Sequence, residues 1–137
     1  MDFARPLAPY LLSILRIMTG LLFLAHGTGK WLGFPAGAMG YPASFSNITS
    51  FFSSPVAGLF ELVGGTLIVL GLFTRPVAFI LSGVAAFAYF IGHWPRNFYP
   101  LLNSGDAAVL YSFIFLYLFA AGGGVWSLDK VLGLSKD

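Results

Sequence analysis

Four long apolar segments follow one another along the chain, at about residues 9–30, 55–73, 76–94 and 105–125. Each is close to the roughly 20 residues that an α-helix needs to cross the hydrocarbon core of a membrane. Runs of this length are too long for buried strands, and an open sheet cannot satisfy its backbone groups in lipid. The pattern therefore predicts an all-α fold, a transmembrane four-helix antiparallel bundle that makes a single domain of residues 1–137.

The connections between these segments differ in length. About three residues, Thr74–Pro76, join the second and third segments, which predicts an antiparallel hairpin. Residues 31–54, rich in glycine, proline and serine, predict a long extracytoplasmic loop between the first two segments. Apolar residues at helical spacing within it indicate either a short amphipathic helix in the membrane interface or an irregular loop over the bundle. These residues are Phe45, Ile48, Phe51 and Phe52.

Composition supports a membrane protein. The chain is 58% hydrophobic and 9% charged, whereas a soluble domain has about 25% charged residues. The net charge is only +2 and the basic residues are scattered, so the expected partner is the lipid bilayer and not nucleic acid. The absence of cysteine excludes thiolate chemistry and cysteine-ligated metal sites within this chain.

Basic residues in short loops predict the orientation. With both termini cytoplasmic, four basic residues lie inside and two outside. The inner four are Arg5, Arg75, Lys130 and Lys136, and the outer two are Lys30 and Arg96.

Polar residues inside a membrane are costly, so their depth indicates where function lies. Antiparallel threading brings seven polar residues from all four segments to one depth near the outer face. They are His26, Lys30, Glu61, His93, Arg96, Asn103 and Asp106. The inner half has nothing comparable apart from Arg16. A ligand or polar site near the outer membrane face is therefore predicted.

Glu61 follows Phe60 and precedes Leu62, so its carboxyl group must be paired, protonated or next to water. Two interpretations are open: a structural ion pair with Lys30 or Arg96, or a role in proton transfer or ligand binding. In both, Glu61 is predicted to face the interior and to contact at least one basic residue of the outer cluster.

The other polar residues also have two interpretations each. His26 either belongs to the site or hydrogen-bonds at the interface. Asn103 and Asp106 are spaced as a capping pair for the fourth helix, which is the favoured interpretation. Arg16 either extends to the cytoplasmic head groups or reaches the glutamate of the outer cluster. Asp129 is predicted to cap a helix or anchor the C-terminal tail.

A haem held by His26 and His93 is not expected, because both lie near the outer boundary. A metal site that adds Glu61 and Asp106 lacks any local ligand motif, so no metal is predicted. Small residues four apart on the third segment are predicted to pack against other helices. These pairs are Ser82 with Ala86 and Ala88 with Gly92.

Several spaced blocks resemble the DoxX family of small bacterial and archaeal membrane proteins, although many relatives have Glu where this chain has Asp106. The blocks are Arg16, Gly20, Phe23, His26, Gly27 and Lys30; Glu61, Gly64 and Gly65; Gly71, Thr74, Arg75 and Ala78; Asn103, Gly105, Asp106, Ala108, Leu110 and Tyr111; and Trp126–Asp129. The resemblance implies four spans in a bacterial or archaeal cytoplasmic membrane and an association with quinone-coupled redox systems.

The first functional interpretation is an accessory subunit or partner of a membrane redox enzyme, in a homo- or hetero-oligomer. The chain itself is expected to carry no cofactor and no enzymatic activity when isolated, and the outer polar residues would contact a quinone head group or a partner protein. One alternative is a protein that conducts protons or a small molecule through Glu61 with His26 or His93. Another is a purely structural assembly subunit.

Overall fold

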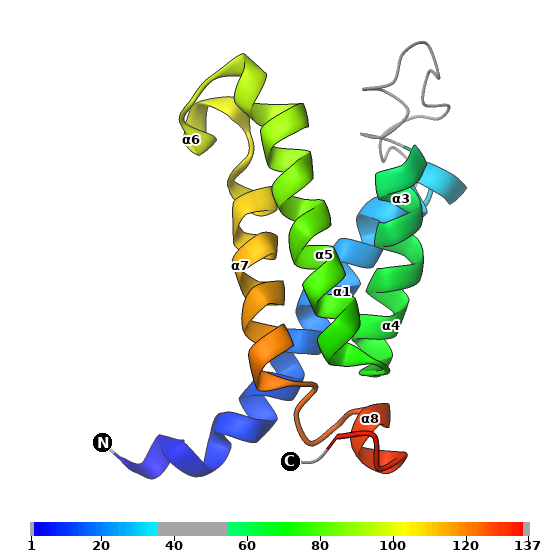
Figure 1. Ribbon diagram of the computed structural model, residues 1–137, viewed down its shortest axis with the longest axis vertical. Helices are drawn as coiled ribbons and strands as arrows, with labels where there is room; N and C mark the ends of the chain where they lie inside the picture. Colours follow the sequence, from blue (N-terminus) through cyan, green and yellow to red (C-terminus); the bar gives the residue numbers. More distant parts are fainter. Residues whose placement is uncertain (1, 36–54, 136–137) are drawn as a thin grey trace.

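The structure is a computed structural model that describes residues 2–35 and 55–135. Every regular element in these two ranges is helical, which confirms the all-α prediction (Figure 1). The predicted interfacial helix or loop, with Phe45, Ile48, Phe51 and Phe52, lies outside the described residues.

The first half of the chain forms two helical segments. A 3₁₀ helix, η1 (Asp2–Leu7), leads into α1 (Ala8–Leu32). The second segment is continuous but has three parts: α3 (Ala57–Leu59), the π-helical η3 (Phe60–Gly64) and α4 (Gly65–Leu70). It lies within the predicted span 55–73.

The second half forms two more segments and two short helices. The elements are α5 (Thr74–Ala88), the π-helical η4 (Tyr89–His93), the 3₁₀ helix η5 (Trp94–Arg96), α6 (Pro100–Asn103), α7 (Asp106–Ala121) and α8 (Leu128–Val131). α7 ends earlier than the predicted residue 125, because Gly122 and Gly124 have φ angles of 86° and 75° and cannot continue a right-handed helix. The hairpin turn after α4 begins at Gly71, three residues earlier than predicted, with φ 67°.

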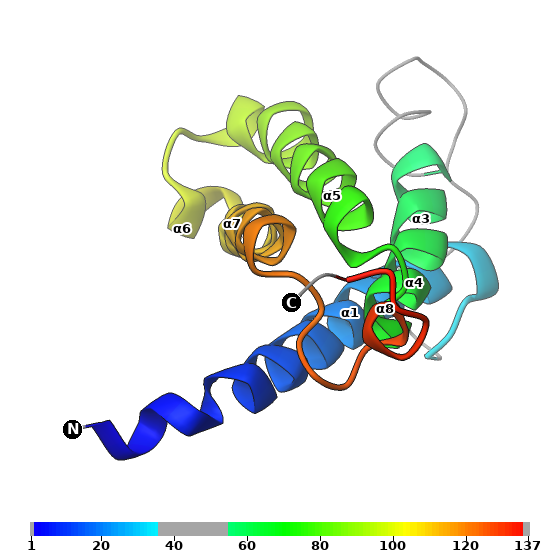
Figure 2. The same ribbon diagram turned by 60° about the horizontal axis from the view of Figure 1, so that its bottom comes forward.

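The four segments pack as two pairs. α1 packs mainly against η3 and α4, and α5 packs mainly against α7 (Figures 1 and 2). Reciprocal hydrogen bonds join the second pair: Ser82 Oγ donates to the Ser112 carbonyl at 2.8 Å, and Ser112 Oγ donates to the Ser82 carbonyl at 3.1 Å. The predicted packing role of Ser82 is therefore confirmed.

A glycine brings the first pair into close contact. A Cβ atom at Gly27 would lie 2.5 Å from the backbone nitrogen of Leu62, which is closer than non-bonded atoms approach. α1 therefore lies directly on the backbone of η3. This contact sets the position of the next turn of α1, which carries Lys30.

Polar side chains are buried and apolar ones exposed to an unusual degree. Among the described residues, more polar than apolar side chains are buried. Large apolar side chains are exposed on all four segments, among them Leu22, Val63, Phe79 and Phe113. The stretches Phe3–Leu32 and Thr74–Arg96 are long and apolar enough to cross a membrane, whereas Ala57–Leu70 and Asp106–Ala121 are apolar but shorter. Exposed apolar surface of this extent is typical of a protein in contact with lipid.

Arg16 is fully buried at the end of the molecule where both termini lie, which we call the terminal end (Figure 1). Its guanidinium donates to the carbonyls of Gly123 at 2.8 Å, Val69 at 2.6 Å and Trp126 at 2.5 Å, and also to that of Ile68. Both predicted roles of Arg16 are wrong. The carbonyls at the end of α4 carry partial negative charge, so they attract the guanidinium. That of Ile68 also accepts from the Gly71 backbone nitrogen at 3.1 Å.

Two more charged residues cap helices at the terminal end. The Asp129 carboxylate accepts hydrogen bonds from the backbone nitrogens of Phe73, at 2.7 Å, and Thr74, at 2.8 Å, where α5 begins. Arg75 donates to the carbonyls of Phe119, at 3.0 Å, and Ala120, where α7 ends. The predicted capping role of Asp129 is therefore confirmed.

Candidate functional site

A cavity of about 450 Å³ lies between the two helix pairs, toward the end of the molecule away from the termini. Five of the seven predicted polar residues line it: His26, Lys30, Glu61, His93 and Arg96. The rest of its wall is Phe23, Val84, Ala85, Ala88, Gly92, Ser104, Ala107, Ala108 and Tyr111. We call this hollow the polar cavity.

The central feature of the polar cavity is an ion pair between α1 and η3. Lys30 Nζ lies 2.7 Å from Glu61 Oε1, and each side chain is only 10% exposed. The predicted contact between Glu61 and a basic residue is therefore present. The second carboxylate oxygen, Oε2, is buried and accepts no hydrogen bond from any described residue. Such an oxygen is costly to leave without a donor, so it marks a position where a hydrogen-bond donor would be stabilised.

Both π-helical segments contribute to the cavity wall. Glu61 lies in η3 and His93 lies in η4. π-helical turns are rare and occur often at functional sites, because the extra residue changes which side chains face a neighbouring helix. The backbone is thus irregular where two of the polar residues enter the cavity.

The two histidines use the same ring nitrogen, Nδ1, to contact a backbone carbonyl. Nδ1 of His26 is 2.8 Å from the Leu22 carbonyl, and Nδ1 of His93 is 3.0 Å from the Asn103 carbonyl. A carbonyl only accepts, so Nδ1 carries the proton in both rings. In the tautomer that carries this proton, Nε2 of each ring is left as an acceptor. The cavity wall combines cationic donors with carboxylate and imidazole acceptors.

Asn103 and Asp106 do not line the cavity. Asn103 is buried, and its side chain organises the turn before α7: Oδ1 accepts from the Gly105 nitrogen at 2.8 Å, and Nδ2 donates to the Asn97 carbonyl at 2.8 Å. Asp106 is exposed on the first turn of α7. Asn103 thus fulfils a local role near the helix start, without the reciprocal capping that was predicted.

Residues 2–35 and 55–135 contain no group of three or more His, Asp or Glu side chains placed to hold a metal ion. The polar cavity has apolar walls and a few converging polar groups, which are common features of small-molecule sites.

Tyr111 and Phe23 belong to the cavity wall but were not predicted from their chemistry. The Tyr111 ring lies edge-on to Phe23, with centroids 5.1 Å apart, and to His26, with centroids 5.9 Å apart. α7 is apolar on every side, so no stripe of polar residues distinguishes its inward face. Only its appearance in the DoxX-like block singled out Tyr111.

The packing prediction for Gly92, made together with Ala88, is wrong for the glycine. Both line the polar cavity, and a Cβ atom at Gly92 would meet nothing within 4 Å. Gly92 therefore leaves space open and does not seat another helix.

The family described as DoxX matches residues 11–94. An uncharacterized protein of Haemophilus influenzae is 43% identical over 89% of this chain and 90% of its own length. The inner membrane protein YphA of Escherichia coli is 33% identical over the same shares. A putative oxidoreductase of Bacillus subtilis, CatD, is 33% identical over 66% of this chain and 72% of its own. No solved structure matches. The chain therefore belongs to the DoxX family of membrane proteins.

Proposed function

We propose that this protein crosses a bacterial cytoplasmic membrane four times, with both termini cytoplasmic, and that its polar cavity binds a quinone head group for a partner redox enzyme. The observation that carries the proposal is the buried, unpartnered Oε2 of Glu61 beside Lys30 in the cavity wall. The inner membrane relative supports the location. The relative named a putative oxidoreductase supports the redox association.

The exposed apolar side chains support four crossings, because α4 and α7 expose them as α1 and α5 do. The 16 residues of α7 span about 24 Å at about 1.5 Å per residue, somewhat less than the hydrocarbon core of roughly 30 Å. A bilayer adapts to a short helix by local thinning, at a modest cost. α7 is therefore long enough to cross.

Cysteine labelling tests the topology. The chain contains no cysteine, so single-cysteine variants report one position each. Asn97→Cys and Ser135→Cys should react with a membrane-impermeant maleimide from opposite sides of sealed vesicles. If only α1 and α5 crossed the membrane, both positions would label from the same side. That result would reject four crossings.

The chemistry of the cavity suits both redox states of a quinone. The carbonyl oxygens of a quinone accept hydrogen bonds, which Lys30 and Arg96 are able to donate. The hydroxyl groups of the quinol donate, and Glu61 Oε2 and the two histidine Nε2 atoms are acceptors. The phenyl ring of Phe23 and the phenol ring of Tyr111 provide apolar wall for the ligand ring.

Quinol binding to the purified protein tests this proposal. We expect saturable binding of duroquinol, measured by tryptophan fluorescence, that Glu61→Gln weakens by about ten- to a hundredfold, since one charge-assisted hydrogen bond is worth roughly 1.5–3 kcal/mol. Arg96→Gln serves as a second variant, because Arg96 is exposed and its loss leaves the buried ion pair intact. Arg96→Gln should weaken the binding of oxidised duroquinone more than that of duroquinol. Absence of saturable binding of both forms to the wild-type protein would overturn the proposal.

Conduction by Glu61 with His26 or His93 is the second candidate, because all three side chains line the same cavity. However, buried apolar residues fill the interior next to the cavity, among them Phe23, Leu81 and Phe115. They oppose a continuous polar path to the terminal end. Proton flux in proteoliposomes that Glu61→Gln abolishes would favour conduction over quinone binding.

A further inference from the structure

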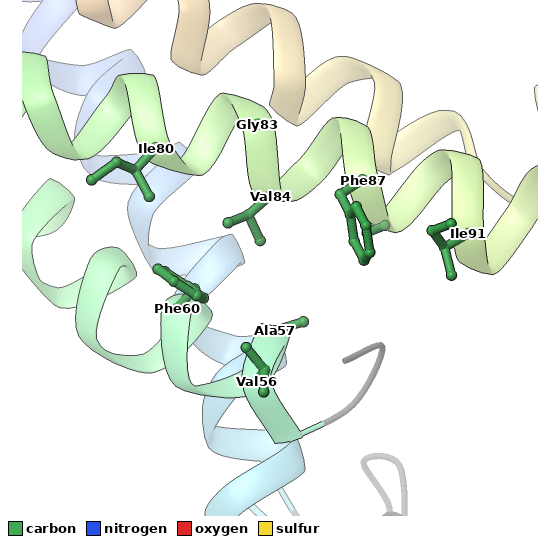
Figure 3. A pocket seen from close by; sticks show the side chains of 9 residues that line it. Val56, Ala57, Phe60, Ile80, Gly83, Val84, Phe87 and Ile91 are labelled. Atoms are coloured by element: carbon green, nitrogen blue, oxygen red, sulfur yellow. The ribbon is translucent and has the colours of Figure 1, made fainter. Parts of the chain in front are cut away.

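An apolar groove of about 560 Å³ runs between the start of the second segment and α5. Figure 3 shows its two walls facing each other, with Val56, Ala57 and Phe60 on one side and side chains of α5 and η4 on the other. The complete lining is Val56, Ala57, Phe60, Ile80, Gly83, Val84, Phe87, Ala88 and Ile91. Every lining residue is apolar, so the groove offers no partner to a polar group.

The groove and the polar cavity lie on either side of the same gap between η3 and α5. Val84 and Ala88 of α5 line both hollows. Across the gap, Phe60 lines the groove and its neighbour Glu61 lines the polar cavity. A ligand that reached from one hollow to the other would therefore pass between Val84 or Ala88 and the Phe60–Glu61 backbone.

We propose that the groove holds the linear apolar tail of the ligand whose polar head lies in the polar cavity, and that this ligand enters sideways from the bilayer. The inference rests on the proposed function and extends it from a head group to a class of molecule, an amphiphile with one compact polar head and one long apolar tail. A head bound at Glu61 needs an outlet for its tail, and the groove is the neighbouring hollow, since Val84 and Ala88 line both.

The groove guides the tail more than it tightens binding. Lipid tails are as apolar as the groove lining, so a tail gains little free energy when it leaves the bilayer. Filling the groove would instead force the tail against protein and penalise tailed ligands alone. A quinone without a tail would be unaffected.

Two open glycines allow each hollow to be filled separately. A Cβ atom at Gly83, in the groove, or at Gly92, in the polar cavity, would meet nothing within 4 Å. Gly83→Phe places a ring in the groove, and Gly92→Phe places one in the polar cavity. Leu110→Phe is the matched control, because Leu110 is exposed on α7 and lines neither hollow.

The experiment compares decylubiquinone with duroquinone, which has no tail, by equilibrium binding at one fixed detergent concentration. Gly83→Phe should lower the affinity for decylubiquinone at least fivefold and leave the affinity for duroquinone within twofold of the wild-type value. Gly92→Phe should weaken the binding of both ligands, and Leu110→Phe should weaken the binding of neither.

The outcomes separate the two proposals. If Gly83→Phe leaves decylubiquinone binding unchanged while Gly92→Phe weakens it, the head site stands and the tail assignment is overturned. The tail assignment is also overturned if Gly83→Phe weakens the binding of both ligands equally, because the ring would then act on the head site and not on the tail. Binding of neither quinone to the wild-type protein would overturn the proposed function and the tail assignment with it.

Discussion

Replacing Arg16 with methionine is expected to lower the free energy of unfolding by several kcal/mol. Methionine fills a similar volume but donates no hydrogen bond. The carbonyls of Val69, Gly123 and Trp126 would lose the guanidinium, and each buried acceptor left unsatisfied costs about 1–3 kcal/mol. Replacing a buried charge by an apolar group is tolerated when its partner is replaced too. Here the partners are backbone carbonyls, which no substitution removes.

The unfolding midpoint in mixed detergent micelles measures this effect. Arg16→Lys should fall between wild type and Arg16→Met, because an ammonium group keeps the charge but reaches fewer carbonyls than a guanidinium. Arg96→Met is the control, since Arg96 is exposed at the opposite end. The expectation would be contradicted if the free energy of unfolding of Arg16→Met lay within about 1 kcal/mol of the wild-type value, which is the net contribution of one ordinary hydrogen bond. The carbonyls would then have found other donors.

Breaking the buried pair between Lys30 and Glu61 from one side should be the other large effect. Glu61→Leu leaves the Lys30 ammonium buried without its partner, and loss of one partner of such a pair costs about 3–5 kcal/mol. Lys30→Met should cost a similar amount. The double variant Lys30→Met with Glu61→Leu should recover most of the stability, because both charges are then gone.

The double variant also separates a structural pair from a binding site. Recovered stability with lost duroquinol binding indicates that the pair recognises the ligand. Recovered stability with unchanged binding assigns the pair to helix packing alone. A double variant as unstable as the sum of the two single variants would contradict the paired arrangement, since residues in contact are not expected to add.

The sequence predicted the cavity because depth in a membrane follows from chain order. His26 and Lys30 end the first segment, and Glu61 lies near the start of the second, so opposite chain directions bring them to one level. The same argument placed Asn103 and Asp106 there. Chain order does not determine which way a side chain points. Asn103 points into the turn before α7, and Asp106 points outward from the first turn of α7.

Arg16 was misinterpreted because all its hydrogen-bond partners among the described residues are backbone atoms. A search for opposite charges considers only side chains, and the carbonyls that bind Arg16 belong to the end of α4 and the glycine-rich turn after α7. The π-helical turns at Glu61 and His93 were also missed. One extra residue in a uniformly apolar helix leaves no break in the hydropathy pattern.

The charged contacts at the terminal end connect the two helix pairs to each other. Arg16 joins α1 and α4 to the chain that follows α7, and Asp129 joins the start of α5 to the C-terminal tail. Both helix pairs are thus fastened at their base, and the hollows lie between their far ends. Because the pairs are joined at one end, a small rotation of one pair there would produce a larger separation between their far ends. The separation of the two helix pairs around the hollows is therefore constrained by contacts at the opposite end of the molecule.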